Sequence, residues 1–113
     1  MPRFVILEHD HPFLHWDFML EVGDRLRTWR LLEEPGAGRT VRAEMLGAHR
    51  KQYLDYEGPV SGNRGSVQRW DAGLFDWQVD ANERTVVSLH GRRCQGTVTL
   101  EPDAAGAWTF MLA

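Results

Sequence analysis

Three side chains near the start of the chain could hold a divalent metal ion. His15 and Asp17 stand two residues apart in a strictly alternating stretch, so both point to one face of an extended strand. Pro12 interrupts the run just upstream, and a turn over residues 10–12 would fold His9 back beside His15. Two imidazoles and one carboxylate on a rigid surface are a ligand set for a divalent metal with open coordination positions.

The stretch Phe13–Glu21 must position this ligand set, and its alternation predicts how. One side of the strand carries His15, Asp17 and Met19. The other side carries only apolar residues, namely Leu14, Trp16, Phe18 and Leu20. We therefore expect these four side chains to form a buried wall, with the ligand set on the opposite, open face.

Length and composition limit the class of protein. We expect a single domain over residues 1–113 with one modest core. No stretch approaches the ~20 apolar residues that span a bilayer, and the start of the chain lacks a charged-then-apolar signal pattern. We therefore expect a cytoplasmic protein with no membrane partner. The single cysteine, Cys94, excludes an internal disulfide and a cysteine-based zinc cage.

Charge is unevenly distributed along the chain. The formal net charge of −3 argues against a general nucleic-acid coat protein. Residues 25–51 nevertheless hold seven bases against three acids, and twelve of the thirteen bases in the chain are arginine. The arginine fork suits bidentate contact with phosphate. This window is therefore either an anion-binding face or an ordinary solvated one.

Short strands separated by turn signals are predicted along the chain. The candidate strands are 4–8, 13–21, 25–32, 40–45, 66–70, 74–79, 85–90, 97–101 and 108–112. A turn is predicted at residues 71–73, and Gly47–Pro59 has no clean period, which indicates an irregular loop across the sheet. No segment has sustained helical periodicity. The pattern predicts an all-β fold, a small antiparallel β-barrel of about eight strands or a sandwich, with little helix.

The candidate ligands lie in a motif that resembles the signature of a known family. The run from His9 to Glu21 is similar to H-D-x-x-x-L-H-[YFW]-D-F-R-L-E, the signature of the 3′-phosphoesterase domain of bacterial DNA ligase D. Downstream, His49, Tyr53 and the pair Glu57-Gly58 resemble the H-P-L-D-Y-x-D-F-E-G segment of that family. The matching blocks follow in the right order and cover essentially the whole chain.

The resemblance implies a fold, a reaction and a set of roles. It implies a small β-barrel with an outer active-site groove, which uses Mn²⁺, or alternatively Zn²⁺ or Co²⁺, to remove 3′-phosphates or 3′-ribonucleotides in DNA repair. The metal ligands would be His9, His15 and Asp17, and His49 and Tyr53 would act at the scissile phosphate. The implied partners are the 3′ ends of DNA or RNA–DNA primers, together with a DNA ligase or polymerase.

Several positions depart from the family pattern. Met19 stands where the family has an arginine, and Glu33 stands where a lysine is usual. A further family arginine is displaced, because Val41 occupies its place and Arg42 follows one residue later. Arg42 is therefore our candidate for holding the phosphate. We expect metal binding to be retained and turnover to be weak.

Three functions remain open from the sequence. The first is a metal-dependent phosphoesterase at nucleic-acid 3′ ends, and the second is a non-catalytic module that binds such ends or a repair partner. The third is a non-haem iron oxygenase, because His15-Trp16-Asp17 contains the H-x-D pair of that class. An end-trimming assay with manganese separates the first two, and iron-dependent oxygen consumption would support the third.

Overall fold

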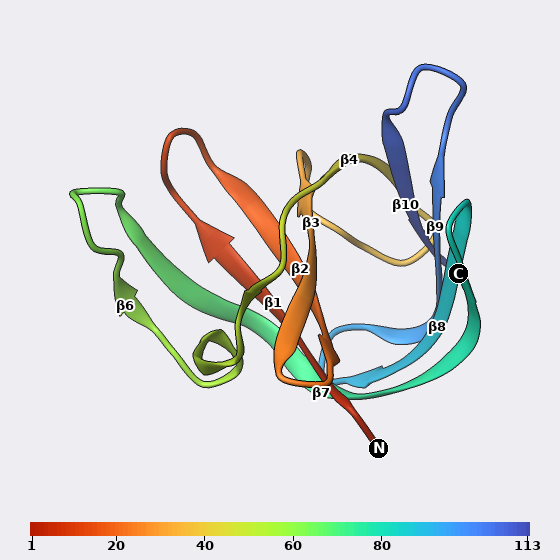
Figure 1. Cartoon of the computed structure of the whole chain (residues 1–113), viewed down its shortest axis with the longest axis horizontal. Helices are drawn as coiled ribbons and strands as arrows, with labels where there is room; N and C mark the ends of the chain where they lie inside the picture. The colour runs from red at the N-terminus through yellow and green to blue at the C-terminus, as the bar shows by residue number, and fades with distance from the viewer.

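Eight strands close into an antiparallel β-barrel in the computed structural model, which describes residues 1–113 (Figure 1). Their order around the barrel is β1 (Arg3–His9), β2 (His15–Val22), β3 (Arg25–Leu31), β4 (Thr40–Met45), β10 (Trp108–Leu112), β9 (Gln95–Pro102), β8 (Arg84–Gly91) and β7 (Ser66–Ala81). β1 pairs with β2 on one side and with β7 on the other, which closes the ring. The predicted all-β barrel is confirmed.

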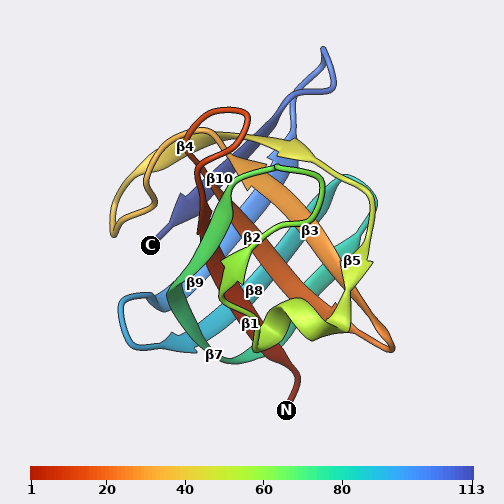
Figure 2. The same cartoon turned by 90° about the vertical axis from the view of Figure 1, so that its left-hand side faces the viewer.

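Three short elements lie outside the ring, in the segment between β4 and β7. β5 (His49–Arg50) pairs with β3, a 3-10 turn η1 covers Lys51–Leu54, and β6 (Gly58–Pro59) pairs with β7. Figure 2 shows this segment passing over the outside of the barrel near β1, β2 and β3. The predicted path across the sheet is right, although the two strand pairings within it were not predicted. None of the helical turns is long or apolar enough to cross a membrane.

The barrel interior holds the larger of two hydrophobic clusters. Phe18 packs there against three other aromatic rings. Its ring centroid lies 6.3 Å from that of Phe4, 6.1 Å from that of Trp29 and 5.2 Å from that of Phe110. These contacts join β2 to β1, β3 and β10, so one side chain links four strands of the barrel.

The predicted buried wall of β2 is right for Trp16, Phe18 and Leu20, which all belong to the interior cluster. It is wrong for Leu14, whose side chain is 53% exposed. The strand begins only at His15, and Leu14 belongs to the connection from β1, beyond the end of the barrel. Alternation along the sequence therefore fails at the point where the strand itself stops.

A second hydrophobic cluster covers the outside of the barrel. Met19 of β2 and Leu7 of β1 point outward there and pack with Leu54 of η1. Tyr53 and Tyr56 of the outer segment pack against the same cluster. β1 and β2 are therefore buried on both faces along most of their length, and the prediction of an open face opposite the wall is wrong. The outer segment covers that face because its own apolar side chains are buried against it.

The predicted turn at residues 71–73 is also wrong, because these residues lie in the middle of β7. The pairing of β7 with β1 shifts its register between Ile6 and Leu7, which leaves Trp70 as the extra residue of a β-bulge. A bulge and a turn share the same local sequence signals. Only the pairing with β1 distinguishes them.

The carboxylate of Asp71 ties β7 to the β8–β9 loop. It is buried and accepts hydrogen bonds from the backbone N–H groups of Ala72, Arg92 and Cys94, at 2.9, 2.9 and 2.8 Å. A side chain at Gly91 would collide with this carboxylate, so that position requires glycine. Burial and the nearby Asp71 raise the pKa of the Cys94 thiol to about 12, so the thiol stays protonated and unreactive.

Replacing Phe18 by alanine should destabilise the barrel by about 3–5 kcal/mol, close to the whole stability of a small domain. The cost arises from the cavity left among the surrounding aromatic rings. Urea denaturation followed by tryptophan fluorescence would measure it. Met111→Ala is the matched control, because Met111 is 43% exposed on β10 and its truncation should change stability by less than about 0.5 kcal/mol. Equal stabilities of the two variants would contradict the assignment of the interior cluster.

Candidate metal centre

Strand pairing brings the three candidate ligands together at one end of the β1–β2 pair. His9 and His15 lie directly opposite one another in the register, and Asp17 follows two residues along β2 on the same outer face. One potential ligand atom from each residue lies within 4.8 Å of the other two. His15 and Asp17 are buried, with 1% and 4% of their surface exposed, and His9 is partly buried. We call these residues the triad.

Backbone carbonyls fix the tautomers of both histidines. His15 Nδ1 donates to the carbonyl of Phe13 at 2.9 Å, and His9 Nε2 donates to the carbonyl of Arg64 at 2.8 Å. A carbonyl oxygen can only accept, so these two ring nitrogens must carry the protons. In the neutral imidazoles, His15 Nε2 and His9 Nδ1 therefore present lone pairs. Metal-ligating histidines are typically held in this way by a partner on the other ring nitrogen.

The two lone pairs converge on the carboxylate of Asp17. His15 Nε2 lies 3.3 Å from Asp17 Oδ1, and His9 Nδ1 lies 3.6 Å from Asp17 Oδ2. His15 Nε2 and Asp17 Oδ1 are buried and have no hydrogen-bond partner. Acceptors that face one another without a donor cost free energy in a buried site. A divalent cation between them would satisfy all three groups, so the donor set fits such an ion.

A cavity of about 130 Å³ adjoins the triad. It is lined by His9, Asp17 and Met19 of β1 and β2, by His49 and Tyr53 of the outer segment, and by Leu7, Val60, Arg64 and Val67. The structure thus brings His49 and Tyr53 to the same cavity as two of the triad residues, which agrees with what the family resemblance implies. We call it the triad cavity.

His49 has one ring nitrogen free for a ligand. Its Nδ1 donates to the carbonyl of Gly47 at 2.9 Å, and its Nε2 has no partner within the protein. The imidazole packs edge-on against Tyr53, with 6.1 Å between ring centroids. β5 pairs His49 with Leu26 of β3, so strand pairing holds the imidazole in place. The Nε2 atom can therefore exchange a proton or a hydrogen bond with a group bound in the triad cavity.

Ionic contacts fasten the outer segment to the barrel. Lys51 Nζ lies 2.8 Å from Glu21 Oε2, and the backbone N–H of Arg3 donates to Glu21 Oε1 at 2.9 Å. The hydrogen bond from Lys51, followed by that from Arg3, lowers the pKa of the Glu21 carboxyl below its ordinary value. The stabilisation is therefore present above the ordinary pKa of a glutamate and is lost as the pH falls through the lowered value.

Two residues singled out from the sequence lie away from the triad cavity. Arg42 is on β4 and lines a separate hollow beside Trp108. Glu33 is exposed in the loop that follows β3. Neither lines the triad cavity, so neither is placed to contact a group bound there.

Two other arginines lie beside the triad, and the sequence analysis did not identify them as site residues. Arg30 stands directly opposite Asp17 in the β2–β3 pair, and Arg64 lines the triad cavity. The two-residue turn between Val22 and Arg25 sets the register of the hairpin. The position of Arg30 opposite Asp17 could therefore have been predicted from the sequence. The position of Arg64 was not, because it depends on contacts with β1 more than fifty residues away.

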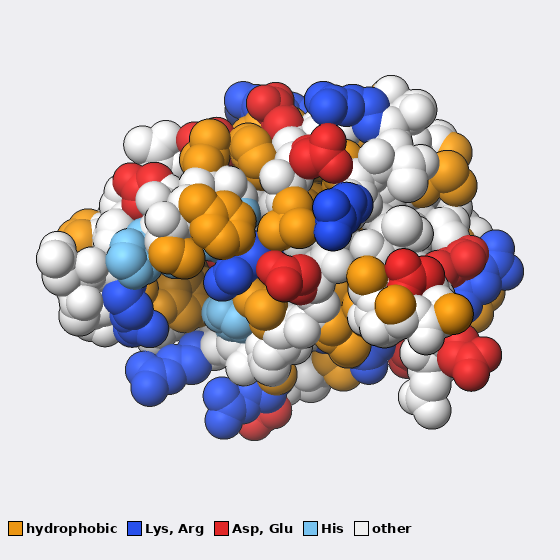
Figure 3. Space-filling view, turned by 90° about the horizontal axis from the view of Figure 1, so that it is seen from above, with side chains coloured by type: hydrophobic (Ala, Val, Ile, Leu, Met, Phe, Trp, Pro, Cys, Tyr) orange, Lys and Arg blue, Asp and Glu red, His pale blue; other side chains and the backbone are white.

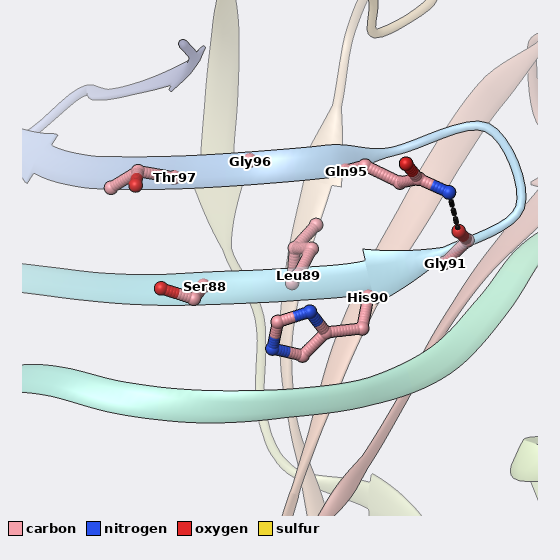
Figure 4. Close-up of a pocket in the computed structure, with 7 residues that line it drawn as sticks. All are labelled: Ser88, Leu89, His90, Gly91, Gln95, Gly96 and Thr97. Atoms are coloured by element: carbon pink, nitrogen blue, oxygen red, sulfur yellow. Dashed lines mark hydrogen bonds between the residues drawn. The ribbon is translucent and has the colours of Figure 1, made fainter.

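Another hollow lies over the β8–β9 hairpin (Figure 4). Gln95 Nε2 donates there to the carbonyl of Gly91 at 3.1 Å, and His90 Nε2 lies 3.0 Å from Asp76 Oδ2. The remaining polar side chains are the hydroxyls of Ser88 and Thr97. No set of metal ligands converges in this hollow, so the triad cavity remains the candidate site.

The chain is similar to known proteins over most of its length. The family model described as the DNA ligase D 3′-phosphoesterase domain matches residues 7–101. A multifunctional non-homologous end joining protein LigD of Pseudomonas aeruginosa is 32% identical over 78 residues, which cover 65% of this chain and 9% of the relative. A LigD of Mycobacterium tuberculosis, named as a multifunctional non-homologous end joining DNA repair protein, is 27% identical over 114 residues, or 93% of this chain and 15% of the relative. The chain thus spans a small part of the length of these relatives.

Replacing Asp17 by asparagine should stabilise the metal-free protein by about 1 kcal/mol, because the amide N–H can donate to the unpaired His15 Nε2. Thermal denaturation in the presence of EDTA would measure the change. Asp24→Asn in the exposed β2–β3 turn is the control and should leave stability unaltered. A loss of stability on Asp17→Asn would show that the carboxylate already pairs with a protonated imidazole, contrary to the tautomers inferred above.

Proposed function

The chain belongs to the DNA ligase D 3′-phosphoesterase domain family, and from this premise we propose that it trims the 3′ ends of nucleic acid as a metal-dependent phosphoesterase. The proposed substrates are 3′-phosphates and 3′-ribonucleotides on DNA or on RNA–DNA primers in DNA repair. The proposed metal is Mn²⁺, with Zn²⁺ and Co²⁺ as alternatives. The proposed location is the cytoplasm, where bacterial DNA is repaired, and a DNA ligase or polymerase is the proposed protein partner.

One observation carries the proposal: the lone pairs of two tautomer-locked histidines converge on a buried carboxylate that has no donor. A divalent metal bound there would polarise a phosphoryl oxygen. His9, His15 and Asp17 would hold the metal, with the backbone carbonyls of Phe13 and Arg64 fixing the two imidazoles. The chain thus supplies both the ligands and the groups that orient them.

The outer segment supplies the groups that would act on the substrate. His49 Nε2, when protonated, can donate to the oxygen that leaves the phosphorus. Tyr53 lines the same cavity and carries a phenolic O–H that can donate to another phosphoryl oxygen. A cavity of about 130 Å³ accommodates a terminal group and not a duplex, which supports action at an end.

Met19 supports the expectation that turnover is weak. It is 1% exposed and lines the triad cavity with an apolar side chain, two residues from Asp17 on the same strand. A cation at this position would be placed to stabilise charge that develops on the phosphate. The absence of a cation at position 19 also favours a second candidate function, in which the triad cavity binds nucleic-acid ends without cleaving them.

Single-turnover cleavage of a labelled primer carrying a 3′-ribonucleotide or a 3′-phosphate tests the proposal directly. We expect slow cleavage that requires Mn²⁺, stops with EDTA, and falls about a hundredfold or more in His49→Ala, since general acid catalysis is lost. His90→Ala is the matched control, because His90 lies on β8 and pairs with Asp76. A cleavage rate that is unchanged by EDTA, or unchanged in His49→Ala, would refute the proposal. Metal binding by calorimetry without any cleavage would favour the binding module.

Met19→Arg should accelerate cleavage by about tenfold or more, because one charge-assisted contact made mainly in the transition state is worth ~2–4 kcal/mol before the cost of burying the guanidinium. Met19→Leu conserves volume and should leave the rate unchanged. Metal affinity should be similar in the wild type and both variants, as Met19 is not a ligand. A rate that does not rise in a folded Met19→Arg protein would show that another cation already holds the phosphate.

A further inference from the structure

A second hollow adjoins the triad cavity, and its wall is basic. It has a volume of about 380 Å³ and is lined by Arg25, Arg50 and Arg64 together with Ala48, His49, Gln52, Tyr53 and Ser61. No carboxylate lines it, and none of the three guanidinium groups takes part in a salt bridge. We call it the arginine hollow.

Two of these arginines are placed so that they repel one another. Arg25 of β3 and Arg50 of β5 stand directly opposite in the antiparallel register, and both are exposed. Like charges in directly opposed positions destabilise a strand pair. An anion bound between them would reverse the sign of this contribution. The register is therefore an observation in favour of an anionic ligand, independent of the shape of the hollow.

Arg64 presents the third guanidinium in a held position. Its Nε donates to the carbonyl of Ser61 at 2.7 Å, and its Nη2 donates to Ser61 Oγ at 3.2 Å. The Nη1 group has no acceptor within the protein. A guanidinium already held by two hydrogen bonds loses little conformational entropy when it binds a ligand. Arg64 also accepts the hydrogen bond from His9 through its backbone, so it touches the triad directly.

The arginine hollow and the triad cavity share three residues of their walls, His49, Tyr53 and Arg64. Lys and Arg side chains gather around histidines at the left-hand end of the molecule in Figure 3. A chain molecule whose end lies in the triad cavity can therefore continue past His49 and Tyr53 into the arginine hollow.

We propose that the arginine hollow binds a backbone phosphodiester of the single strand whose 3′ end lies in the triad cavity, so that Arg25, Arg50 and Arg64 select nucleic-acid ends over smaller phosphate esters. The proposal rests on the proposed function for the direction of the strand. The geometry that carries it is an unpaired set of guanidinium groups, two of them in register and one anchored, beside the cavity that would take the terminus. Inorganic phosphate shares the chemistry but cannot bridge the two sites.

Fluorescence anisotropy in EDTA tests this without relying on catalysis. The ligands are 3′-phosphorylated, 5′-labelled oligonucleotides of two, four and eight nucleotides, with an unlabelled 3′-mononucleotide and inorganic phosphate as competitors. The wild type should bind the four-nucleotide ligand more tightly than either competitor. The double variant Arg25→Ala/Arg50→Ala should weaken that ligand by about tenfold or more, and should lower the slope of log affinity against log salt by about 1.4. Binding of the mononucleotide should change little.

Three further arginine variants serve as controls. Arg39→Ala removes an exposed arginine that lines neither site and makes no salt bridge, so it should bind as the wild type does. If the double variant folds poorly, the single variant Arg50→Gln serves instead. It removes one charge while keeping a polar side chain, and it should show about half of the change in slope. Arg64→Lys keeps the charge but loses the fork, and should weaken binding less than Arg64→Ala.

The outcomes separate this inference from the proposed function. Folded double-variant protein that binds the four-nucleotide ligand as the wild type does would overturn the inference, even if the wild type cleaves 3′ ends. Inorganic phosphate that competes as well as the oligonucleotide would also overturn it, since the hollow would then be a free-anion site. Arginine-dependent binding that increases with strand length would sustain the inference even if no cleavage occurs.

Discussion

Burial of β1 and β2 on both faces is the constraint on which the rest of the structure depends. β1 is hydrogen-bonded to a neighbouring strand on each edge. One of its faces is covered by the aromatic interior and the other by Leu54 and its neighbours. A strand enclosed in this way has little freedom to shift its register. His9 and His15 therefore stay opposite one another, and the positions of the triad follow from the closure of the barrel.

The triad leaves buried polar atoms without hydrogen-bond partners, which costs the protein stability. Elsewhere the buried carboxylate of Asp71 receives three backbone N–H bonds, whereas the buried carboxylate of Asp17 receives none and faces two lone pairs. The same side-chain type is thus fully satisfied at a structural position and left unsatisfied at the candidate site. This contrast within one small barrel is the pattern expected of a site selected for a ligand and not for packing.

The alternation of apolar and polar residues predicted the features of the fold that depend only on neighbouring residues. Alternation placed Trp16, Phe18 and Leu20 in the interior and the ligand set on the other face, because the period of two needs no knowledge of distant residues. The predictions from alternation were wrong where burial depends on residues far away in the sequence. Leu14 lies beyond the end of a strand, and the segment after β4 covers a face that looked open. Arg64 lies in the segment between β4 and β7 and reaches the triad cavity only through the fold of that segment, so no local motif predicts its position.

The two contacts of Arg64 have a thermodynamic consequence. Its carbonyl holds His9, and its guanidinium lines the arginine hollow, so the main-chain position of one residue is common to both sites. A nucleic-acid strand bound to the Arg64 guanidinium would further restrain the carbonyl that positions His9, which is a candidate metal ligand. Linkage is reciprocal, so metal would tighten the grip on the strand by the same factor by which the strand tightens the grip on metal. Positive cooperativity between cofactor and substrate would thus arise from a single peptide unit, without any rearrangement of the barrel.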